Sequence, residues 1–306
     1  MDGRPSFQGA REMTKNRLRY GLTPYLFLGL PVLIYLVWVI GPMLYSFYLA
    51  FTSWDGFSPP QFVGLKNFTR LFHDRVFYIS LSNNIEWIVL FMTVPIVLGL
   101  TLAMILNGNI PGEKFFKSSF FMPMVLSLVV CGLVWSWLYN PAFGLINSLL
   151  RSIGLDRFAR GWLSDPDVVM ESVITVAIWR QVGYVMILYL AGLQSVDPDL
   201  VNASEVDGAN AVQRFFHVIL PQLAPITVIV IVISIVDSLR AFDLVSVMTR
   251  GGPFNSSSVL ANYMYIQAFN NYRMGYGAAI SVILFIISLV FILFYLNRIA
   301  KEEGNG

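Results

Sequence analysis

Long apolar runs separated by short polar segments dominate the chain. Six of these runs approach the ~20 residues that an α-helix needs to cross a bilayer. They are Pro24–Ala50, Asn84–Leu106, Phe116–Leu138, Val169–Gln194, Leu223–Met248 and Tyr276–Leu296. Each is expected to be helical, because a backbone inside lipid must satisfy its own hydrogen bonds. The pattern therefore predicts an all-α, polytopic membrane protein with six transmembrane helices.

A polar segment, Val196–Pro225, interrupts this pattern between the fourth and fifth runs. Asp197 can cap a first short helix, and Gly208 then allows a sharp bend. Apolar residues recur at helical spacing after this glycine, at Val212, Phe215, Phe216 and Ile219. A second short helix with one apolar face is therefore expected. Pro221 and Pro225 are expected to end that helix and to start the next element.

The composition agrees with a membrane protein. Hydrophobic residues make up 56% of the 306 residues and charged residues only 12%, whereas soluble domains carry about 25% charge. The net charge of +2 gives no reason to expect a nucleic acid as a partner. Basic residues cluster before the first apolar run, at Arg4, Arg11, Lys15, Arg17 and Arg19.

This basic cluster places the N-terminus in the cytoplasm by the positive-inside rule. An even number of spans returns the C-terminus to the cytoplasm and puts the polar segment 196–225 on the same side. The predicted organisation is a cytoplasmic N-terminal tail at 1–23, a transmembrane domain at 24–297 and a cytoplasmic C-terminal tail at 298–306.

Charged residues inside the apolar runs are candidates for function, because each costs about 2.5–3.5 kcal/mol on insertion scales. Arg180 lies near the middle of the fourth run, and the fifth run holds Asp237, Arg240 and Asp243. The last three are spaced i, i+3, i+6, so a continuous helix would place the cation between two carboxylates. Two interpretations remain open: an ion network that locks the fold, and a polar lining for a hydroxylated substrate.

The polar segment resembles the EAA loop of inner-membrane permease subunits of ABC importers, which reads approximately E-A-A-x-x-D-G and later I-x-L-P. The residues that fall on this pattern are Ala203, Ser204, Asp207, Gly208, Val218, Leu220 and Pro221. Asn202 stands where the family has its leading glutamate, and Glu205 lies three residues further on. The resemblance implies a cytoplasmic coupling helix between the fourth and fifth spans.

Shorter motifs elsewhere resemble the sugar-importer branch of this family, and in particular the first of its two permeases, the maltose and glycerol-3-phosphate type. These motifs are WDG at 54–56, FVGLKNF at 62–68, GGP at 251–253 and GYGAAISVILF at 275–285. The resemblance implies a subunit without catalysis of its own that forms half of the pathway for a sugar. An oligosaccharide, a polyol or a sugar phosphate would be the transported compound.

The resemblance also implies the partners and the surroundings of the chain. These are a second homologous permease, an ABC ATPase dimer that uses the ATP, an extracytoplasmic sugar-binding protein and membrane lipid. No cofactor is expected on this chain. The location implied is the cytoplasmic membrane of a bacterium or an archaeon.

Two sets of site residues follow from the same resemblance. The sugar site is expected midway through the membrane, on Arg180, Gln181, Tyr184, Asp237, Ser238, Arg240 and Asp243. Coupling to the ATPase is expected on Asn202, Ala203, Ser204, Glu205, Asp207, Gly208, Phe215, Phe216 and Pro221.

Other function classes lack their motifs in this sequence. No G-x-x-x-x-G-K-[ST] loop is present to hold ATP, and no H-E-x-x-H or G-x-S-x-G motif occurs. His73 and His217 have no second histidine or cysteine at ligand spacing, so no metal site is expected. Two alternatives remain: a secondary transporter that works alone, and a membrane-embedded enzyme that uses Asp237 and Asp243 as an acid–base pair. Neither alternative needs a cytoplasmic docking helix.

Overall fold

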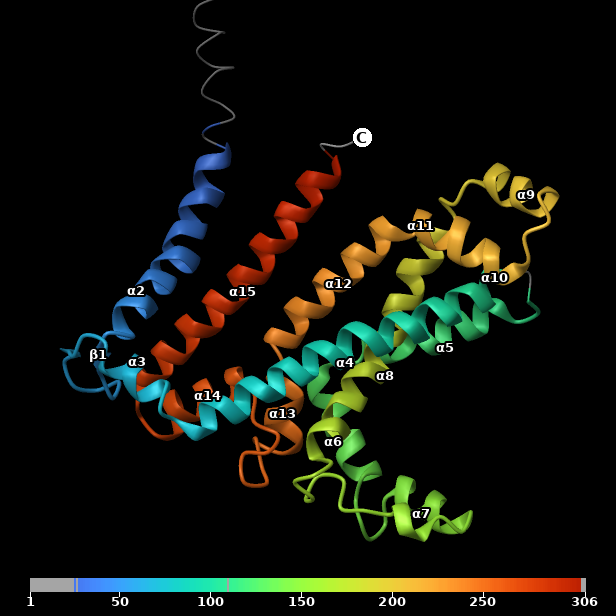
Figure 1. Ribbon diagram of the computed structural model, residues 1–306. Helices are drawn as coiled ribbons and strands as arrows, with labels where there is room; N and C mark the ends of the chain where they lie inside the picture. The colour runs from blue at the N-terminus through green and yellow to red at the C-terminus, as the bar shows by residue number, and fades with distance from the viewer. Residues whose placement is uncertain (1–24, 26, 109, 304–306) are drawn as a thin grey trace, which may run out of the picture.

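The computed structural model describes residue 25, residues 27–108 and residues 110–303, with side chains as far as residue 293. Helices make up most of this part of the chain (Figure 1). The two strands in it, β1 (Thr52–Ser53) and β2 (Gln61–Phe62), form a short antiparallel pair. The predicted helical fold class is confirmed at this level.

Four helices in the described residues are long and apolar enough to cross a membrane. They are Phe27–Leu49, which includes the π-helical turn η1 (Leu36–Ile40) and α2 (Gly41–Leu49), then α4 (Arg75–Leu106), α8 (Val169–Leu193), and Met274–Leu293 within α15 (Met274–Glu303). These match the first, second, fourth and sixth predicted runs. The first is the least packed, because none of its most apolar window is buried inside the chain.

Two helices extend beyond their predicted limits. The long helix α4 begins at Arg75 because the Asp74 side chain caps it, accepting a hydrogen bond of 2.9 Å from the Val76 N–H. The C-terminal helix α15 continues to Glu303, past the predicted end of the sixth span at Leu296. The predicted N-terminal tail, 1–23, lies outside the described residues.

The third predicted run is two helices instead of one. Helix α5 (Glu113–Val125) and helix α6 (Leu128–Leu138) meet at an angle of 101°. The ring of Pro123 and its missing N–H weaken the end of α5. The side chain of Ser127 then caps α6, accepting from the Val130 N–H at 3.3 Å. Apolar composition alone does not reveal this break.

The fifth predicted run is interrupted as well. Helix α12 (Ala224–Leu239) ends at Arg240, and α13 (Asp243–Met248) begins three residues later. The expected i, i+3, i+6 face on one continuous helix is therefore wrong. The described part holds four spans, or up to six if each of the two bent helix pairs is counted as one crossing.

The polar segment forms an elbow of short helices. It comprises α9 (Pro198–Val206), α10 (Ala211–Arg214), the π-helical turn η3 (Phe215–Ile219) and α11 (Leu220–Gln222). The cap at Asp197 is confirmed, since its side chain accepts from the Asp199 N–H at 2.9 Å. Pro221 does not end the second helix as predicted, because the wider π turn before it accommodates a residue without an N–H. A bend of 68° follows at Leu223 instead.

The remaining helices lie at the end of the molecule away from the elbow (Figure 1). They are α3 (Lys66–Leu71), α7 (Leu145–Ser152), the 3-10 turn η2 (Asp156–Phe158), α14 (Leu260–Tyr265) and the π-helical turn η4 (Ile266–Asn270). Helix α7 and the turn η2 lie in the connection between α6 and α8.

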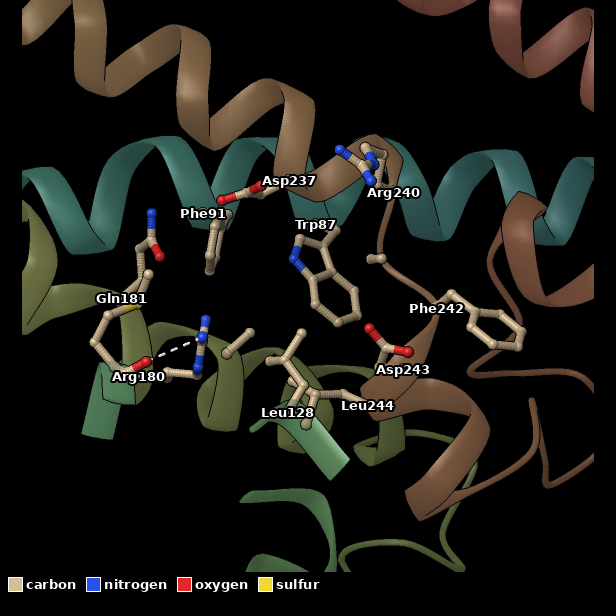
Figure 2. A pocket seen from close by; sticks show the side chains of 13 residues that line it. Trp87, Phe91, Leu128, Arg180, Gln181, Asp237, Arg240, Phe242, Asp243 and Leu244 are labelled. Atoms are coloured by element: carbon tan, nitrogen blue, oxygen red, sulfur yellow. Dashed lines mark hydrogen bonds between the residues drawn. The ribbon is translucent and has the colours of Figure 1, made fainter. Parts of the chain in front are cut away.

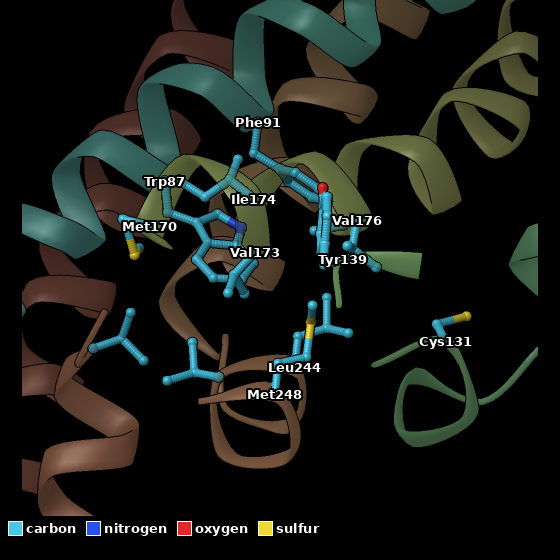
Figure 3. Packing of buried hydrophobic residues seen from close by; sticks show 13 residues of the cluster. Trp87, Phe91, Cys131, Tyr139, Met170, Val173, Ile174, Val176, Leu244 and Met248 are labelled. Atoms are coloured by element: carbon cyan, nitrogen blue, oxygen red, sulfur yellow. The ribbon is translucent and has the colours of Figure 1, made fainter. Parts of the chain in front are cut away.

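The core is centred on α8, which packs along α4 and against α5. Side chains of α4, α6, α8 and α13 form one buried cluster that includes Trp87, Phe91, Val173 and Leu244 (Figure 3). Gly183 allows the close approach of α5, because a Cβ at this position would lie 1.9 Å from the Phe120 carbonyl oxygen. Where such burial removes apolar surface from water, it stabilises the fold by about 25 cal/mol per Å².

Asp74 joins α4 to α14 and α15. Its carboxylate accepts hydrogen bonds from the hydroxyls of Tyr263 and, at 2.6 Å, Tyr276. Burial raises the pKa of Asp74, but hydrogen bonds from the two tyrosines and the Val76 N–H outweigh this and lower the pKa below its usual value. Burial and the neighbouring carboxylate raise the pKa of Tyr263 to about 12.

Asp74→Asn is expected to lower the thermal midpoint of the purified protein in detergent, by about 2–4 °C for each kcal/mol lost. A group whose pKa is lowered by folding contributes stability above its unfolded pKa, near 3.8, and loses it as the pH falls. The difference between wild type and variant should therefore shrink below that pH. Asp167→Asn, at an exposed acid, is the control; an equal effect there would remove the role given to Asp74.

Candidate functional site

A cavity of about 350 Å³ lies beside the middle of α8, among α4, α12, α13 and the break between α5 and α6. Five of the predicted pathway residues line it: Arg180, Gln181, Asp237, Arg240 and Asp243. Aromatic rings complete the wall, from Trp87 and Phe91 on α4 and from Phe242 in the break of the fifth run (Figure 2). The cavity thus combines hydrogen-bonding groups with flat apolar surfaces.

Two predicted pathway residues do not line this cavity. Ser238 is fully buried, and its hydroxyl donates to the Ser234 carbonyl at 2.6 Å. Its own carbonyl accepts from the Asn84 side chain at 3.2 Å, which holds α12 against α4. Tyr184 lies one turn beyond Arg180 on α8, outside the cavity lining.

Arg180 is engaged with the backbone. Its Nη2 donates to the Met124 carbonyl at 3.1 Å, and its Nε donates to the Leu126 carbonyl at 3.3 Å. Both carbonyls lie at the bend between α5 and α6, where helical partners are lacking. The dashed line in Figure 2 marks a hydrogen bond of this arginine. Arg180 therefore stabilises the bend while its side chain forms part of the cavity wall.

The three charged residues around the break between α12 and α13 border the cavity: Asp237, Arg240 and Asp243. Among the described residues, no ion pair within 4.0 Å joins Arg240 to Asp237 or to Asp243. The break at 240–242 separates them, and all three side chains are exposed in this chain. Figure 2 shows Asp237 on the side of Phe91 and Gln181, and Asp243 on the opposite side below Phe242. An internally neutralised ion network does not describe this arrangement.

Gln181 adds a donor to the cavity wall. Its side chain is 2% exposed, and its Nε2 has no hydrogen-bond partner within the described part of the chain. A buried amide without a partner costs about 1–3 kcal/mol. A bound molecule with an acceptor at this position would remove that cost.

The residues that line the α4 side of the cavity were not predicted from the sequence. Trp87 and Phe91 are spaced i, i+4, so one face of α4 presents both rings to the same place. The sequence does hold one indication: Asn83 and Asn84, one turn before Trp87, are polar residues in an apolar run and indicate that this face of α4 packs against polar groups. The Asn84 side chain donates to the Ser238 carbonyl on α12 and accepts from the Leu260 N–H at 2.8 Å.

The elbow is held together by its own side chains. Glu205 on α9 forms an ion pair with Arg214 on α10. Asn210 and Gln213 form a reciprocal capping box at the start of α10, with both bonds at 2.9 Å. Gly208, between the two helices, has a φ of +83°. Glu205 thus ties the two halves of the elbow together, whereas Asn202 lies exposed on α9.

The other predicted coupling residues all lie on the elbow. Ala203 and Ser204 are on α9, Asp207 caps its C-terminal end, Phe215 and Phe216 are in η3, and Pro221 is in α11. Apolar side chains here are strongly exposed: Val206 by 88%, Val212 by 66% and Phe216 by 57%. Single exposed apolar side chains are ordinary, but three on one small elbow form a surface suited to a protein partner.

Metal chemistry finds no support in the described residues. No group of three or more His, Cys, Asp or Glu side chains there is placed to hold a metal ion. Cys131 is buried in the apolar cluster.

Comparison with known proteins identifies relatives along almost the whole chain. Residues 64–301 match the family model described as the inner membrane component of binding-protein-dependent transport systems. The chain is 38% identical to the probable ABC transporter permease protein YurN of Bacillus subtilis, over 92% of this chain and 98% of that protein. It is 34% identical to the arabinooligosaccharides transport system permease protein AraP of the same organism, over 92% and 90% of the two chains.

The fold also matches a solved structure. A chain of a bacterial ABC transporter involved in the import of alginate superposes with a TM-score of 0.81, at 23% identity, over 95% of this chain and 99% of that chain. The acid–base enzyme considered for Asp237 and Asp243 is thereby excluded, because the matching family consists of transport subunits. The chain belongs to the inner-membrane permease components of binding-protein-dependent ABC transport systems.

Proposed function

We propose that this permease forms half of the translocation pathway of a sugar importer, with the cavity between α4, α8, α12 and α13 as its substrate site. The observation that carries the proposal is the composition of the cavity wall. Carboxylates at Asp237 and Asp243, a guanidinium at Arg240 and an amide at Gln181 face the same space as three aromatic rings. The named substrate of the arabinooligosaccharide permease supports a sugar as the transported compound.

Such a wall suits a molecule with many hydroxyl groups. Carboxylates accept hydrogen bonds from neighbouring hydroxyls, and guanidinium groups donate to their oxygens. The rings of Trp87 and Phe91 can lie against the apolar C–H faces of a pyranose or furanose. With two carboxylates and two arginines in the lining, the formal charges cancel, which favours a neutral sugar over a sugar phosphate.

The elbow is proposed as the docking site for a separate ATPase dimer that hydrolyses the ATP. Its exposed Val212 and Phe216 would bind a groove on that partner. Figure 1 supports a common side for the elbow, the beginning of the first span and the end of α15. With the basic N-terminal cluster, this favours a cytoplasmic location for all three. A second permease would complete the pathway, and an extracytoplasmic binding protein would deliver the sugar.

The proposal is tested by purifying the tagged chain from membranes in mild detergent and identifying its partners. An ATPase and a second permease are expected to co-purify. The complex in proteoliposomes, supplied with its binding protein, should take up radiolabelled oligosaccharides only when ATP is present. A chain that transports alone, driven by an ion gradient, would instead support a secondary transporter.

Arg180→Gln is expected to weaken the bend between α5 and α6. The shorter side chain cannot reach both carbonyls, so the bend loses hydrogen bonds from a charged donor, each worth about 1.5–3 kcal/mol. Distances between spin labels on α5 and α6 should broaden, and the thermal midpoint should fall. Arg180→Lys keeps one charged donor and should retain a narrower distribution. Unchanged distances in Arg180→Gln would show that the bend does not depend on this side chain.

A further inference from the structure

Two further cavities lie next to each other along α8. The first, of about 480 Å³, is bordered by the rings of Trp135, Tyr139 and Trp162 and by the carboxylate of Glu171. The second, also about 480 Å³, has a mostly apolar wall that includes Leu98, Phe120, Pro123, Ile178, Trp179 and Val182. Trp135 and Thr175 border both cavities, so the two are adjacent along the helix.

Both cavities lie on the side of α8 that faces away from the substrate cavity. Glu171, Thr175 and Val182 fall on one stripe of the helix, whereas Arg180 points roughly 160° and Gln181 roughly 100° away from that stripe at 3.6 residues per turn. A sugar in the pathway would therefore not reach them. Side chains along the apolar cavity are open to the surroundings of the chain, with Leu98 46% and Phe120 40% exposed.

Together the two cavities are about as long as one leaflet of a bilayer is thick. Glu171 stands in the first turn of α8, and Gly183, at the far end of the apolar cavity, follows twelve residues later. At 1.5 Å per residue the two are about 18 Å apart. One leaflet contributes about half of the ~30 Å hydrocarbon core. The pair thus extends from the membrane interface to about the middle of the membrane.

The chemistry of the first cavity points to a cationic group. The Tyr139 hydroxyl donates to the Ser172 carbonyl at 3.2 Å, and the Trp162 Nε1 donates to Asn147 Oδ1 at 2.8 Å. Their polar ends are thereby satisfied, and since Tyr139 is only 5% exposed while Trp135 and Trp162 are half-buried, the accessible ring surface is mainly that of the two tryptophans. Neighbouring rings are close, with centroids 5.3 Å apart for Trp135 and Tyr139.

The carboxylate beside these rings has the complementary charge. Glu171 is exposed and forms no ion pair with any residue for which the structure describes a side chain. Aromatic faces next to a free carboxylate are the surroundings in which proteins bind ammonium groups. Aromatic side chains are also enriched at the interfacial depth where lipid headgroups lie.

We propose that this pair of cavities binds one phospholipid with an ammonium headgroup, of the phosphatidylethanolamine class. The ammonium lies among the three aromatic rings and forms an ion pair with Glu171. One acyl chain follows the stripe of α8 into the apolar cavity as far as Gly183. The lipid packs against the outside of the bend between α5 and α6, opposite the pathway. This site depends on the membrane location of the chain and not on which compound is transported.

The test uses the complete transporter, purified from nanodiscs that contain equal parts of phosphatidylethanolamine and phosphatidylglycerol. Native mass spectrometry is expected to show phosphatidylethanolamine retained preferentially by the wild-type complex. Glu171→Gln should weaken this retention about twofold to fivefold, because the exposed ion pair is lost while the aromatic rings remain. Leu98→Trp, which narrows the apolar cavity, should reduce the retention of both lipids.

Asp167→Asn is the matched control, because it removes one negative charge near the same end of α8 from a residue that does not border either cavity. Equal retention of the two lipids by wild type, or an unchanged preference in Glu171→Gln, would overturn the proposal. A photo-crosslinker at position 98 gives an independent measurement. Crosslinks to lipid are expected; crosslinks only to the second permease would assign the groove to a protein helix instead.

ATP-dependent sugar uptake by the same preparations distinguishes this proposal from the proposed function. Wild-type complexes that retain phosphatidylethanolamine but take up no sugar would contradict the sugar substrate and leave the lipid site intact. Uptake without selective retention would contradict only the lipid site.

Discussion

Gly208→Val is expected to reduce sugar uptake to near background while the chain still reaches the membrane. Gly208 has a φ of +83°, and no neighbouring atom lies within 4 Å of where a Cβ would be. The substitution therefore acts through the backbone, since a left-handed conformation costs a side-chain-bearing residue about 1–2 kcal/mol. Relief of this strain changes the angle between α9 and α10, and with it the fit of the elbow to the ATPase.

The measurement is ATP hydrolysis and uptake by the same reconstituted complex. Loss of uptake with hydrolysis retained, or loss of the ATPase during purification, is the expected result. Gly154→Val is a matched control, because Gly154 has a φ of +75°, also has no atom within 4 Å of a Cβ, and lies at the opposite end of the molecule. Normal uptake by Gly208→Val would mean that the elbow angle has no part in coupling.

Asp237→Asn is expected to raise the KM for sugar uptake by roughly tenfold to a hundredfold, which corresponds to the loss of about 1.5–3 kcal/mol for hydrogen bonds to a charged group. Asp237 lines the cavity, is exposed in this chain, and has no ion partner among the described residues. Its carboxylate is thus available to accept from sugar hydroxyls. The amide of asparagine keeps the shape but loses the charge.

Uptake as a function of sugar concentration separates the substrate role from a structural one. A structural role would lower the amount of folded complex, and hence the maximal rate, without raising KM. Asp156→Asn, on the turn η2, whose residues do not line the cavity, should leave both parameters unchanged. An unaltered KM in Asp237→Asn would move the sugar away from this end of α12.

The positions of the helices could be predicted from the sequence better than their continuity. Apolar runs and the capping signal at Asp197 were sufficient to place α4, α8, α15 and the elbow. The breaks at 126–127 and 240–242 were not predicted, because each lies within a run that is, taken as a whole, long and apolar enough to cross a membrane. A break depends on whether distant groups satisfy the free carbonyls, as Arg180 does for Met124 from 56 residues away.

The candidate site, too, could be predicted from the sequence only in part. Charged residues in apolar runs identified Arg180, Asp237, Arg240 and Asp243, and all four border one cavity. The sequence could not reveal that Arg180 binds backbone carbonyls or that Arg240 is not paired within the chain. The first fact depends on the bend between α5 and α6, and the second on the break that separates α12 from α13. The rings on α4 were missed because aromatic residues are ordinary in a membrane span.

Helix α12 connects the two parts of the molecule that these predictions concern. Its 16 residues form a rod of about 24 Å, which begins at the Leu223 bend beside the elbow and ends next to Asp237 and Arg240. The elbow is closed on itself directly before this rod, since the Asp197 N–H donates to the side chain of Gln222, the last residue of α11, at 3.0 Å. A tilt of about 10° at Leu223 would carry the far end through roughly 4 Å, more than the length of a hydrogen bond. On the proposed function, the helix would act as a lever arm, on which a small rotation at the ATPase becomes a displacement large enough to release a sugar.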